Sequence, residues 1–370
     1  MDKDTIKVKK KRFSILGIIA LFLVLSFCLF LYWSPGRIEQ FTDEKGNVIE
    51  GSIAEVVRLK IGDVEQGMII RGKSDKNPVL LFLHGGPGAP AYMEFEESGL
   101  MLEDHFTVCW WEQRGSGMSF NSSIPPDTMT IQQLILDTVE VTKYLQTRFG
   151  QEKIYLMGHS WGSFLGIQTA SEYPELYEAY IGIGQIVNKI ESEKLAIEYM
   201  LNQAKTKGDI KLENELSQFS LDDPNTVIRM DYTLARTNAM NKFGIGYSRD
   251  PDKVKSVFME RLSLLTCRAY TIPDKIKNSR GIFFTNKNLY PEIIKYNISE
   301  TVQKLDVPIY IIHGAYDFQV SYKLSREYFD TLEAPYKQFY TFDNSAHRPY
   351  IDEPEKFMEI LTEEVIAGKK

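Results

Sequence analysis

Short apolar runs separated by helical patterns dominate the chain from residue 52 onward. Three of these runs have the length and composition of strands buried inside a sheet, namely PVLLFLH, HFTVCWW and KIYLMGH. Between the last two, residues 131–149 carry apolar side chains at helical spacing. The alternation continues through AYIGIGQI and resumes at VPIYIIHG. Strands that alternate with helices predict an α/β protein whose mostly parallel sheet is covered on both faces.

Residues 188–300 interrupt this alternation with segments rich in Lys and Glu, such as IESEKLAIEYMLNQAKTKG. An insertion of this size is too long to be a loop in a compact domain. We therefore expect a helical cap inserted into an α/β core that comprises residues 52–187 and 301–370. The polar and glycine-containing residues 34–51 are expected to form a connector that leads into the first strands.

The amino terminus has a different pattern, because residues 13–33 contain no charged side chain. As a helix this stretch is long enough to cross about 30 Å of hydrocarbon, and Tyr32 and Trp33 stand at its far end, where aromatic rings favour the interface. Residues 1–12 are strongly basic and are expected to stay in the cytoplasm. The sequence thus predicts a single-pass anchor in the cell membrane, with the catalytic domain on the extracytoplasmic side.

A cleaved signal peptide is the alternative interpretation of residues 13–33. The apolar stretch exceeds the usual length of a signal-peptide core, and no A-x-A-like cleavage site follows it. The uncleaved anchor is therefore favoured over the signal peptide.

Composition narrows the classes of function. The chain has 370 residues, of which 43% are hydrophobic, and can bury one large core or two modest ones. Its net charge of −7 gives no reason to expect nucleic-acid binding, which usually leaves a basic face. Cys28, Cys109 and Cys267 lie far apart and form no CxxC pair, so neither a disulfide framework nor a zinc site is expected. We predict no metal and no cofactor.

Ser160 stands between two glycines in the sequence GHSWG. Gly158 and Gly162 indicate a backbone so tight that a Cβ at either position would collide with neighbouring structure. The segment follows the apolar run KIYLM and precedes the helical pattern SFLGIQTASEY. A serine at a sharp turn from strand to helix is typical of a nucleophile elbow. Because the pattern is short and occurs by chance, the prediction depends on finding its partners.

A serine nucleophile needs a general base, and His347 is the strongest candidate among the five histidines. His84 and His159 belong to glycine-rich motifs, while His105 and His313 lie at strand ends. His347 stands in a loop-like segment, SAHRPYIDEPEKF, after the expected strand KQFYTF and before a terminal helix.

Asp317 is the preferred acid partner of this histidine. It lies just beyond the strand VPIYIIHG, and catalytic groups collect at the carboxyl ends of parallel strands. Asp343 falls at the end of the strand before His347, and Asp306 sits at the wrong end of its own strand. The resulting order of Ser160, Asp317 and His347 is the chain order of serine hydrolases with an α/β fold.

A glycine-rich loop, HGGPG at residues 84–88, follows the strand PVLLFL. Attack on a carbonyl group creates an oxyanion, which preorganised backbone N–H groups stabilise. We assign the two donors of this oxyanion hole to Gly86, with its neighbour Gly85 as an alternative, and to Trp161. A phosphate-binding loop is excluded, because neither G-x-G-x-x-G nor a following Gly-Lys-Ser/Thr is present.

Together, HGGPG, WWEQRGSGMSF, GHSWGS, Asp317 and His347 resemble the α/β-hydrolase superfamily, and most closely its proline iminopeptidase branch. The resemblance runs from about Ser52 to the end of the chain. It implies an α/β-hydrolase fold with a helical cap, Ser160 as nucleophile, and Asp317 and His347 as the rest of the triad.

Three features depart from this family pattern. Glu112 stands where the family usually has Asp before Gln-Arg-Gly, and His159 stands where the aminopeptidases usually carry Gly. The cap glutamates that bind the free amine of the substrate in the family match no single position here. Glu112 and Arg114 are interpreted as structural residues that hold the loop beside the site.

These observations predict a membrane-anchored serine hydrolase that forms an acyl-enzyme and cleaves short peptides or amides, as a proline iminopeptidase does. A carboxylesterase or other acyl hydrolase is the first alternative, since fold and triad do not fix the leaving group. A non-catalytic receptor that keeps the pocket is the second. The cap carboxylates Glu191, Glu193 and Glu198 could receive a cationic amine, but the interleaved lysines favour a solvated helix face.

Overall fold

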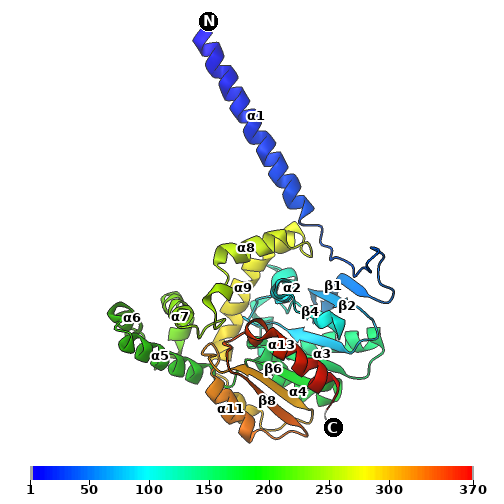
Figure 1. Ribbon diagram of the computed structural model, residues 1–370, viewed down its shortest axis with the longest axis vertical. Helices are drawn as coiled ribbons and strands as arrows, with labels where there is room; N and C mark the ends of the chain where they lie inside the picture. Colours follow the sequence, from blue (N-terminus) through cyan, green and yellow to red (C-terminus); the bar gives the residue numbers. More distant parts are fainter. Residues whose placement is uncertain (1–2, 369–370) are drawn as a thin grey trace.

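A single sheet of eight strands, in the order β1-β2-β4-β3-β5-β6-β7-β8, forms the centre of the molecule (Figure 1). The computed structural model describes the backbone of residues 3–368 and the side chains of residues 17–256 and 258–368. The strands are β1 (Ile53–Ile61), β2 (Val64–Gly72), β3 (Val79–Leu83), β4 (Thr107–Trp111), β5 (Ile154–His159), β6 (Tyr177–Ile183), β7 (Ile309–Gly314) and β8 (Lys337–Phe342). Only β2 runs antiparallel to its neighbours β1 and β4, so the predicted mostly parallel α/β sheet is confirmed.

Helices cover both faces of this sheet. One face carries α3 (Ile131–Phe149), α4 (Trp161–Glu172) and α11 (Tyr322–Thr331). The other carries α2 (Tyr92–Ser98), α12 (Pro349–Asp352), α13 (Pro354–Glu359) and the π-helical segment Ile360–Ile366. Because both faces are covered, the residues of β3, β4, β5 and β7 are all buried, which explains their nearly continuous apolar sequence.

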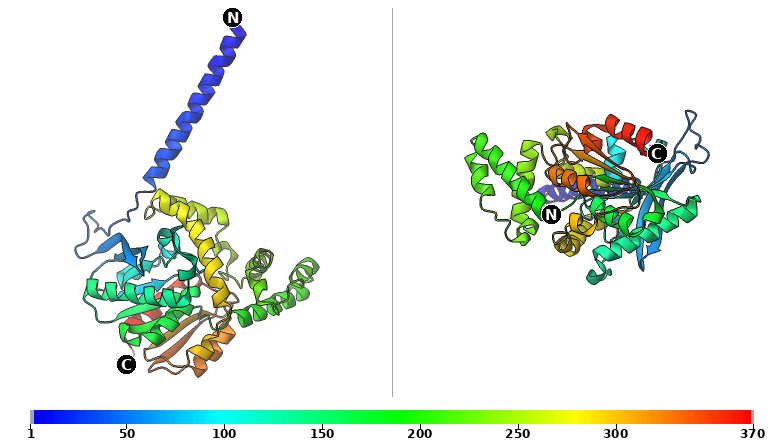
Figure 2. Two further views of the ribbon diagram at one scale, coloured as in Figure 1. Left: turned by 180° about the vertical axis from the view of Figure 1, so that it is seen from behind. Right: turned by 90° about the horizontal axis from the view of Figure 1, so that it is seen from below.

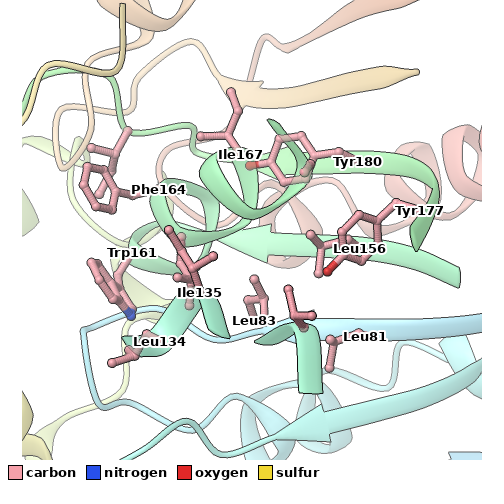
Figure 3. Packing of buried hydrophobic residues seen from close by; sticks show 14 of the residues in the cluster. Leu81, Leu83, Leu134, Ile135, Leu156, Trp161, Phe164, Ile167, Tyr177 and Tyr180 are labelled. Atoms are coloured by element: carbon pink, nitrogen blue, oxygen red, sulfur yellow. The ribbon is translucent and has the colours of Figure 1, made fainter. Parts of the chain in front are cut away.

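The packing on the α3 and α4 face holds the start of α4 in place (Figure 3). Leu83 at the end of β3 and Leu134 of α3 belong to the same buried cluster as Trp161 and Phe164, which lie in the first turn of α4. The rings of Trp161 and Phe164 stack with their centroids 5.4 Å apart. The junction between β5 and α4 is therefore anchored by large buried side chains.

The region between β6 and β7 is helical. It contains α5 (Lys189–Thr206), α6 (Ile210–Leu216), α7 (Met230–Phe243), α8 (Val257–Thr266), α9 (Ile272–Ile293) and α10 (Ile298–Thr301). Helices α5 to α7 share an apolar cluster of their own and extend away from the sheet, whereas α8 and α9 lie on the side of α2 (Figures 1 and 2). The domain boundaries at residues 188 and 300 stay a prediction.

The amino-terminal helix α1 (Lys3–Tyr32) projects away from the rest of the molecule (Figure 1). The chain that follows is attached to the α8 and α9 region, because the Lys275 ammonium donates hydrogen bonds to the carbonyl oxygens of Trp33 and Leu265, both at 2.6 Å. The Arg268 guanidinium also donates to the carbonyl oxygen of Tyr32 at 3.0 Å.

The predicted membrane anchor at residues 13–33 is overturned. Within the described residues, no helix is both long enough and apolar enough to cross a membrane. The predicted localisation, a single-pass cell-membrane protein with its catalytic domain on the extracytoplasmic side, is therefore wrong.

Candidate active site

Ser160 occupies the sharp turn between β5 and α4. Its backbone has φ 56° and ψ −118°, a conformation that is rare for any residue other than glycine. A Cβ on Gly158 would collide with the carbonyl group of Gly162, and a Cβ on Gly162 would collide with that of Leu83. The Ser160 N–H donates to the carbonyl oxygen of Ile183 at 2.9 Å. The local geometry is that of a strand-turn-helix elbow with a serine at its tip.

His347 and Asp317 meet at the carboxyl ends of β7 and β8. The Nδ1 atom of His347 lies 2.8 Å from Oδ2 of Asp317. The Nε2 atom of His313 lies 3.1 Å from the same oxygen, and the N–H of Val320 donates to Oδ1 at 2.9 Å. Burial alone would raise the pKa of the Asp317 carboxyl, but His347 and His313 hold that pKa well below its usual range. A buried carboxylate thus orients the imidazole of His347.

The elbow and the histidine loop are joined through His159. Burial and the nearby His347 lower the pKa of His159 to about 3, so its ring is neutral at physiological pH. Its Nε2 atom lies 3.0 Å from the carbonyl oxygen of His347, which only accepts hydrogen bonds, so Nε2 is the donor. The centroids of the two rings are 4.6 Å apart. This contact holds the backbone of His347 next to the residue that precedes Ser160.

No hydrogen bond directly joins the side chains of Ser160 and His347 within the described part of the chain. Catalytic hydrogen bonds are often long before substrate binds and close only in the complex. The two residues are nevertheless brought to one edge of the sheet, because Ser160 follows β5 and His347 follows β8, and both are parallel strands of the same sheet. The arrangement leaves the Nε2 side of His347 as the side available to the serine, because Nδ1 contacts Asp317.

The HGGPG loop passes directly beside the nucleophile. A Cβ on Gly85 would lie 3.3 Å from the Cβ of Ser160. Gly86 has φ 116°, in the region that favours glycine. Trp161 is the first residue of α4, so its N–H is one of those at the helix start that lack an intrahelical acceptor. Both predicted oxyanion donors, Gly86 and Trp161, therefore belong to segments that border Ser160.

Gln113, to which the sequence analysis gave no role, links these two segments. Its side-chain amide donates to the carbonyl oxygen of His84 at 3.1 Å and accepts from the indole N–H of Trp161 at 2.8 Å. Gln113 is fully buried. The signal that could have identified it is its place in the EQRGSG run, which is part of the family resemblance.

Glu112 and Arg114 flank Gln113 and make contacts of a structural kind. The Glu112 carboxyl accepts hydrogen bonds from the N–H of Met118 and the hydroxyl of Tyr270, and burial raises its pKa to about 7. Arg114 forms a buried ion pair with Asp137, with Nε 2.7 Å from Oδ2. These contacts support the interpretation that both residues hold the loop beside the site.

Two of the three cap glutamates considered above, Glu191 and Glu193, pair with cations of the cap. Glu193 is buried and pairs with Lys189 and Arg236, each at 2.5 Å. Burial alone would raise the pKa of Glu193, but these two cations lower it to about 2. Glu191 lies at the surface and pairs with Lys194 at 2.7 Å. Neither carboxylate is offered to a ligand.

A cavity of about 800 Å³ lies next to this edge of the sheet. On the core side it is lined by residues that directly follow HGGPG and His347, among them Ala89, Pro90, Glu94, Arg348 and Tyr350. On the cap side it is lined by α8 and α9, with Glu260, Arg261, Asn278 and Ile282. We call it the α8–α9 pocket. Its volume falls in the range of small-molecule binding sites.

This fold and this arrangement of loops define a hydrolase class. Residues 78–354 match the family described as the alpha/beta hydrolase fold, and the chain belongs to that family. It is a hydrolase that resembles the proline iminopeptidase branch, as the sequence motifs predicted.

Among individual relatives, the chain is 34% identical to a probable aminopeptidase, YbaC, of Bacillus subtilis (strain 168), over 84% of this chain and 96% of that protein. It is 26% identical to a proline iminopeptidase of Clostridioides difficile (strain 630), over 78% of this chain and 89% of that protein. The crystal structure of a Mycobacterium smegmatis proline iminopeptidase superposes with a TM-score of 0.59 at 18% identity, covering 84% and 97% of the two chains. At that identity the superposition shows the shared fold alone.

Proposed function

We propose that this hydrolase is a serine aminopeptidase that acts on short peptides or amides with a free amino terminus, with an amino-terminal proline as the first substrate to test. The observation that carries the proposal is the 2.8 Å contact between His347 and Asp317, at the same edge of the sheet as the Ser160 elbow. The names of the aminopeptidase and proline iminopeptidase relatives support the choice of substrate class.

In this proposal, Ser160 attacks the carbonyl carbon of the scissile bond while His347 Nε2 accepts the hydroxyl proton. The oxyanion that forms is stabilised by the N–H groups of Gly86 and Trp161, and one such donor is worth about 3 kcal/mol in other serine hydrolases. As the C–N bond breaks, His347 returns the proton to the leaving amine. A water molecule then attacks the acyl-enzyme, with His347 again acting as base, and releases the acid and free Ser160.

Recognition of a free α-ammonium requires a carboxylate near the scissile bond. Two side chains in the α8–α9 pocket could supply it. Glu94 lies in α2, close after HGGPG, and although its burial would raise its pKa, Arg348 and its other partners hold that pKa below the usual value. Glu260 lies opposite, on α8, and has no ion-pair partner within 4 Å in the described residues. Two carboxylates therefore line the pocket next to the loops that carry the proposed machinery.

The test uses the full-length protein and its Ser160→Ala variant. A fluorophosphonate probe should label the wild-type enzyme and should not label the variant. An unblocked prolyl amide should be hydrolysed with a larger kcat/KM than its N-acylated counterpart. Labelling that survives the loss of Ser160 would remove the nucleophile from the proposal. Equal rates for blocked and free prolyl amides, together with much faster cleavage of an uncharged acyl ester, would identify a carboxylesterase instead.

A further inference from the structure

The charged side chains of the α8–α9 pocket divide into paired and unpaired groups. Glu94 pairs with Arg348, with a carboxylate oxygen 3.2 Å from a guanidinium nitrogen, and Lys255 pairs with Glu97. Within each pair, the negative and the positive charge neutralise each other at the pocket wall. The ammonium group of Lys253 is also engaged, because it donates to the carbonyl oxygen of Ile351 at 3.0 Å.

Three charged side chains in the pocket remain without such a partner. Among the described residues, Asp252, Glu260 and Arg261 form no ion pair within 4 Å, and all three line the pocket. Glu260 is exposed, and partial desolvation at the pocket raises the pKa of its carboxyl above the usual value. The pocket thus presents unpaired groups of both signs, two carboxylates and one guanidinium.

Asn278 adds an unsatisfied hydrogen-bond donor to the same pocket. It belongs to α9, it is only 6% exposed, and its Nδ2 atom has no hydrogen-bond partner in the described part of the chain. A buried amide N–H group without an acceptor is costly, and an unsatisfied buried group needs an explanation such as a ligand. Because the group is a donor, the ligand atom that satisfies it must be a hydrogen-bond acceptor, such as an oxygen of a carboxylate or a carbonyl group.

We infer that the α8–α9 pocket binds a short free peptide as a zwitterion, and that Asn278 and Arg261 bind its carboxylate. The carboxylate accepts hydrogen bonds from the Asn278 amide and pairs with the Arg261 guanidinium, while Asp252 and Glu260 carry the charge that complements the ammonium end. The inference rests on the proposed function, which assigns recognition of the substrate's free amine to this pocket. It adds that the preferred leaving group carries its own carboxylate, so free dipeptides and tripeptides bind more tightly than amides or longer chains.

The matched probes are prolyl-alanine and prolyl-alaninamide, which share a free amine and differ only in the terminal carboxylate. We would measure the equilibrium binding of both to the full-length Ser160→Ala protein, where hydrolysis does not interfere. The free dipeptide should bind about tenfold more tightly than the amide, as expected for a hydrogen-bonded charge. Adding Arg261→Gln should bring the ratio close to one, and adding Asn278→Asp should reverse it, because a carboxylate would then face a carboxylate.

Arg280→Gln is the matched control, because Arg280 is an exposed arginine of α9 that does not line the pocket. It should leave the binding ratio unchanged. Equal binding of the two probes to the Ser160→Ala protein, or a preference that survives Arg261→Gln, would overturn the inference, and so would the absence of binding for both. Hydrolysis by the wild-type enzyme separates the two proposals. Cleavage of both probes at equal rates contradicts this inference alone, whereas cleavage of acyl esters and of neither probe contradicts the proposed aminopeptidase function.

Discussion

The edge of the sheet that carries Ser160 and the pocket beneath α8 and α9 hold their reactive groups in opposite ways. At the sheet edge, Asp317, His347 and Gln113 are buried and each has specific hydrogen-bond partners. In the pocket, Glu260 and Arg261 are exposed and have no ion-pair partner in the described residues. Under the two proposals, this difference is the one expected between a preorganised reaction centre and a pocket whose polar groups are satisfied by a ligand.

The largest effect is expected at the sheet edge, where the carboxylate is fixed by its neighbours. Asp317→Asn should lower kcat by about 10⁴-fold, because an amide stabilises neither the required tautomer nor the positive charge of the imidazole. KM should change little by comparison, and the rate is measured on an acyl ester so that pocket effects do not interfere. Asp343→Asn, at an exposed position after β8, is the control. A large loss in Asp343→Asn with none in Asp317→Asn would reassign the acid.

A smaller effect is expected in the pocket, where the groups are exposed to solvent. Glu260→Gln should reduce the preference for a free over an N-acylated prolyl amide by about fivefold, in line with the modest worth of exposed charges. The measured quantity is the ratio of the two kcat/KM values. Glu215→Gln provides a matched control, since Glu215 is exposed on α6 and does not line the pocket. An unchanged ratio in Glu260→Gln would leave Glu94 as the remaining candidate for amine recognition.

The smallest effect concerns stability at the sheet edge and its pH dependence. Burial raises the pKa of Glu112 to about 7 in the folded protein, above the unfolded value of 4.5. A raised folded pKa contributes stability that is fully present below the unfolded pKa and is lost as the pH rises through the folded pKa. The Tm of the wild-type protein should therefore fall between about pH 5 and pH 8 by more than that of Glu112→Gln. Glu191→Gln, at the surface, should keep the wild-type slope, and equal slopes in all three proteins would contradict the prediction.

Much of the fold could be predicted because its signals are local. The apolar runs that end in Leu83 and His159 are buried on both faces, and this continuous burial makes such strands visible without knowledge of the fold. Ser160 could be proposed from its glycines, since the collisions that forbid a Cβ arise within one turn of the chain and the strand beside it. Asp317 and His347 could be proposed from chain order and from their places after strands.

Other features were beyond the reach of the sequence because they depend on distant contacts. Gln113 and Trp161 are 48 residues apart and meet only when β4 and β5 enclose β3. The position of His313 next to Asp317 gave no sequence signal beyond a strand end. Asn278 becomes notable only once its burial and missing partner are known. The predicted localisation depended on the apolar residues 13–33 and the basic residues before them, whereas the described part of the chain contains no helix that could cross a membrane.

The backbone conformation of Ser160 also has an evolutionary consequence. A left-handed conformation costs a residue with a side chain roughly 1–3 kcal/mol, a cost that glycine avoids. A glycine at position 160 would relieve this strain but would remove the hydroxyl group. An elbow without the hydroxyl would therefore give the more stable fold. Under the proposed function, selection for thermal stability and selection for turnover would therefore oppose each other at Ser160.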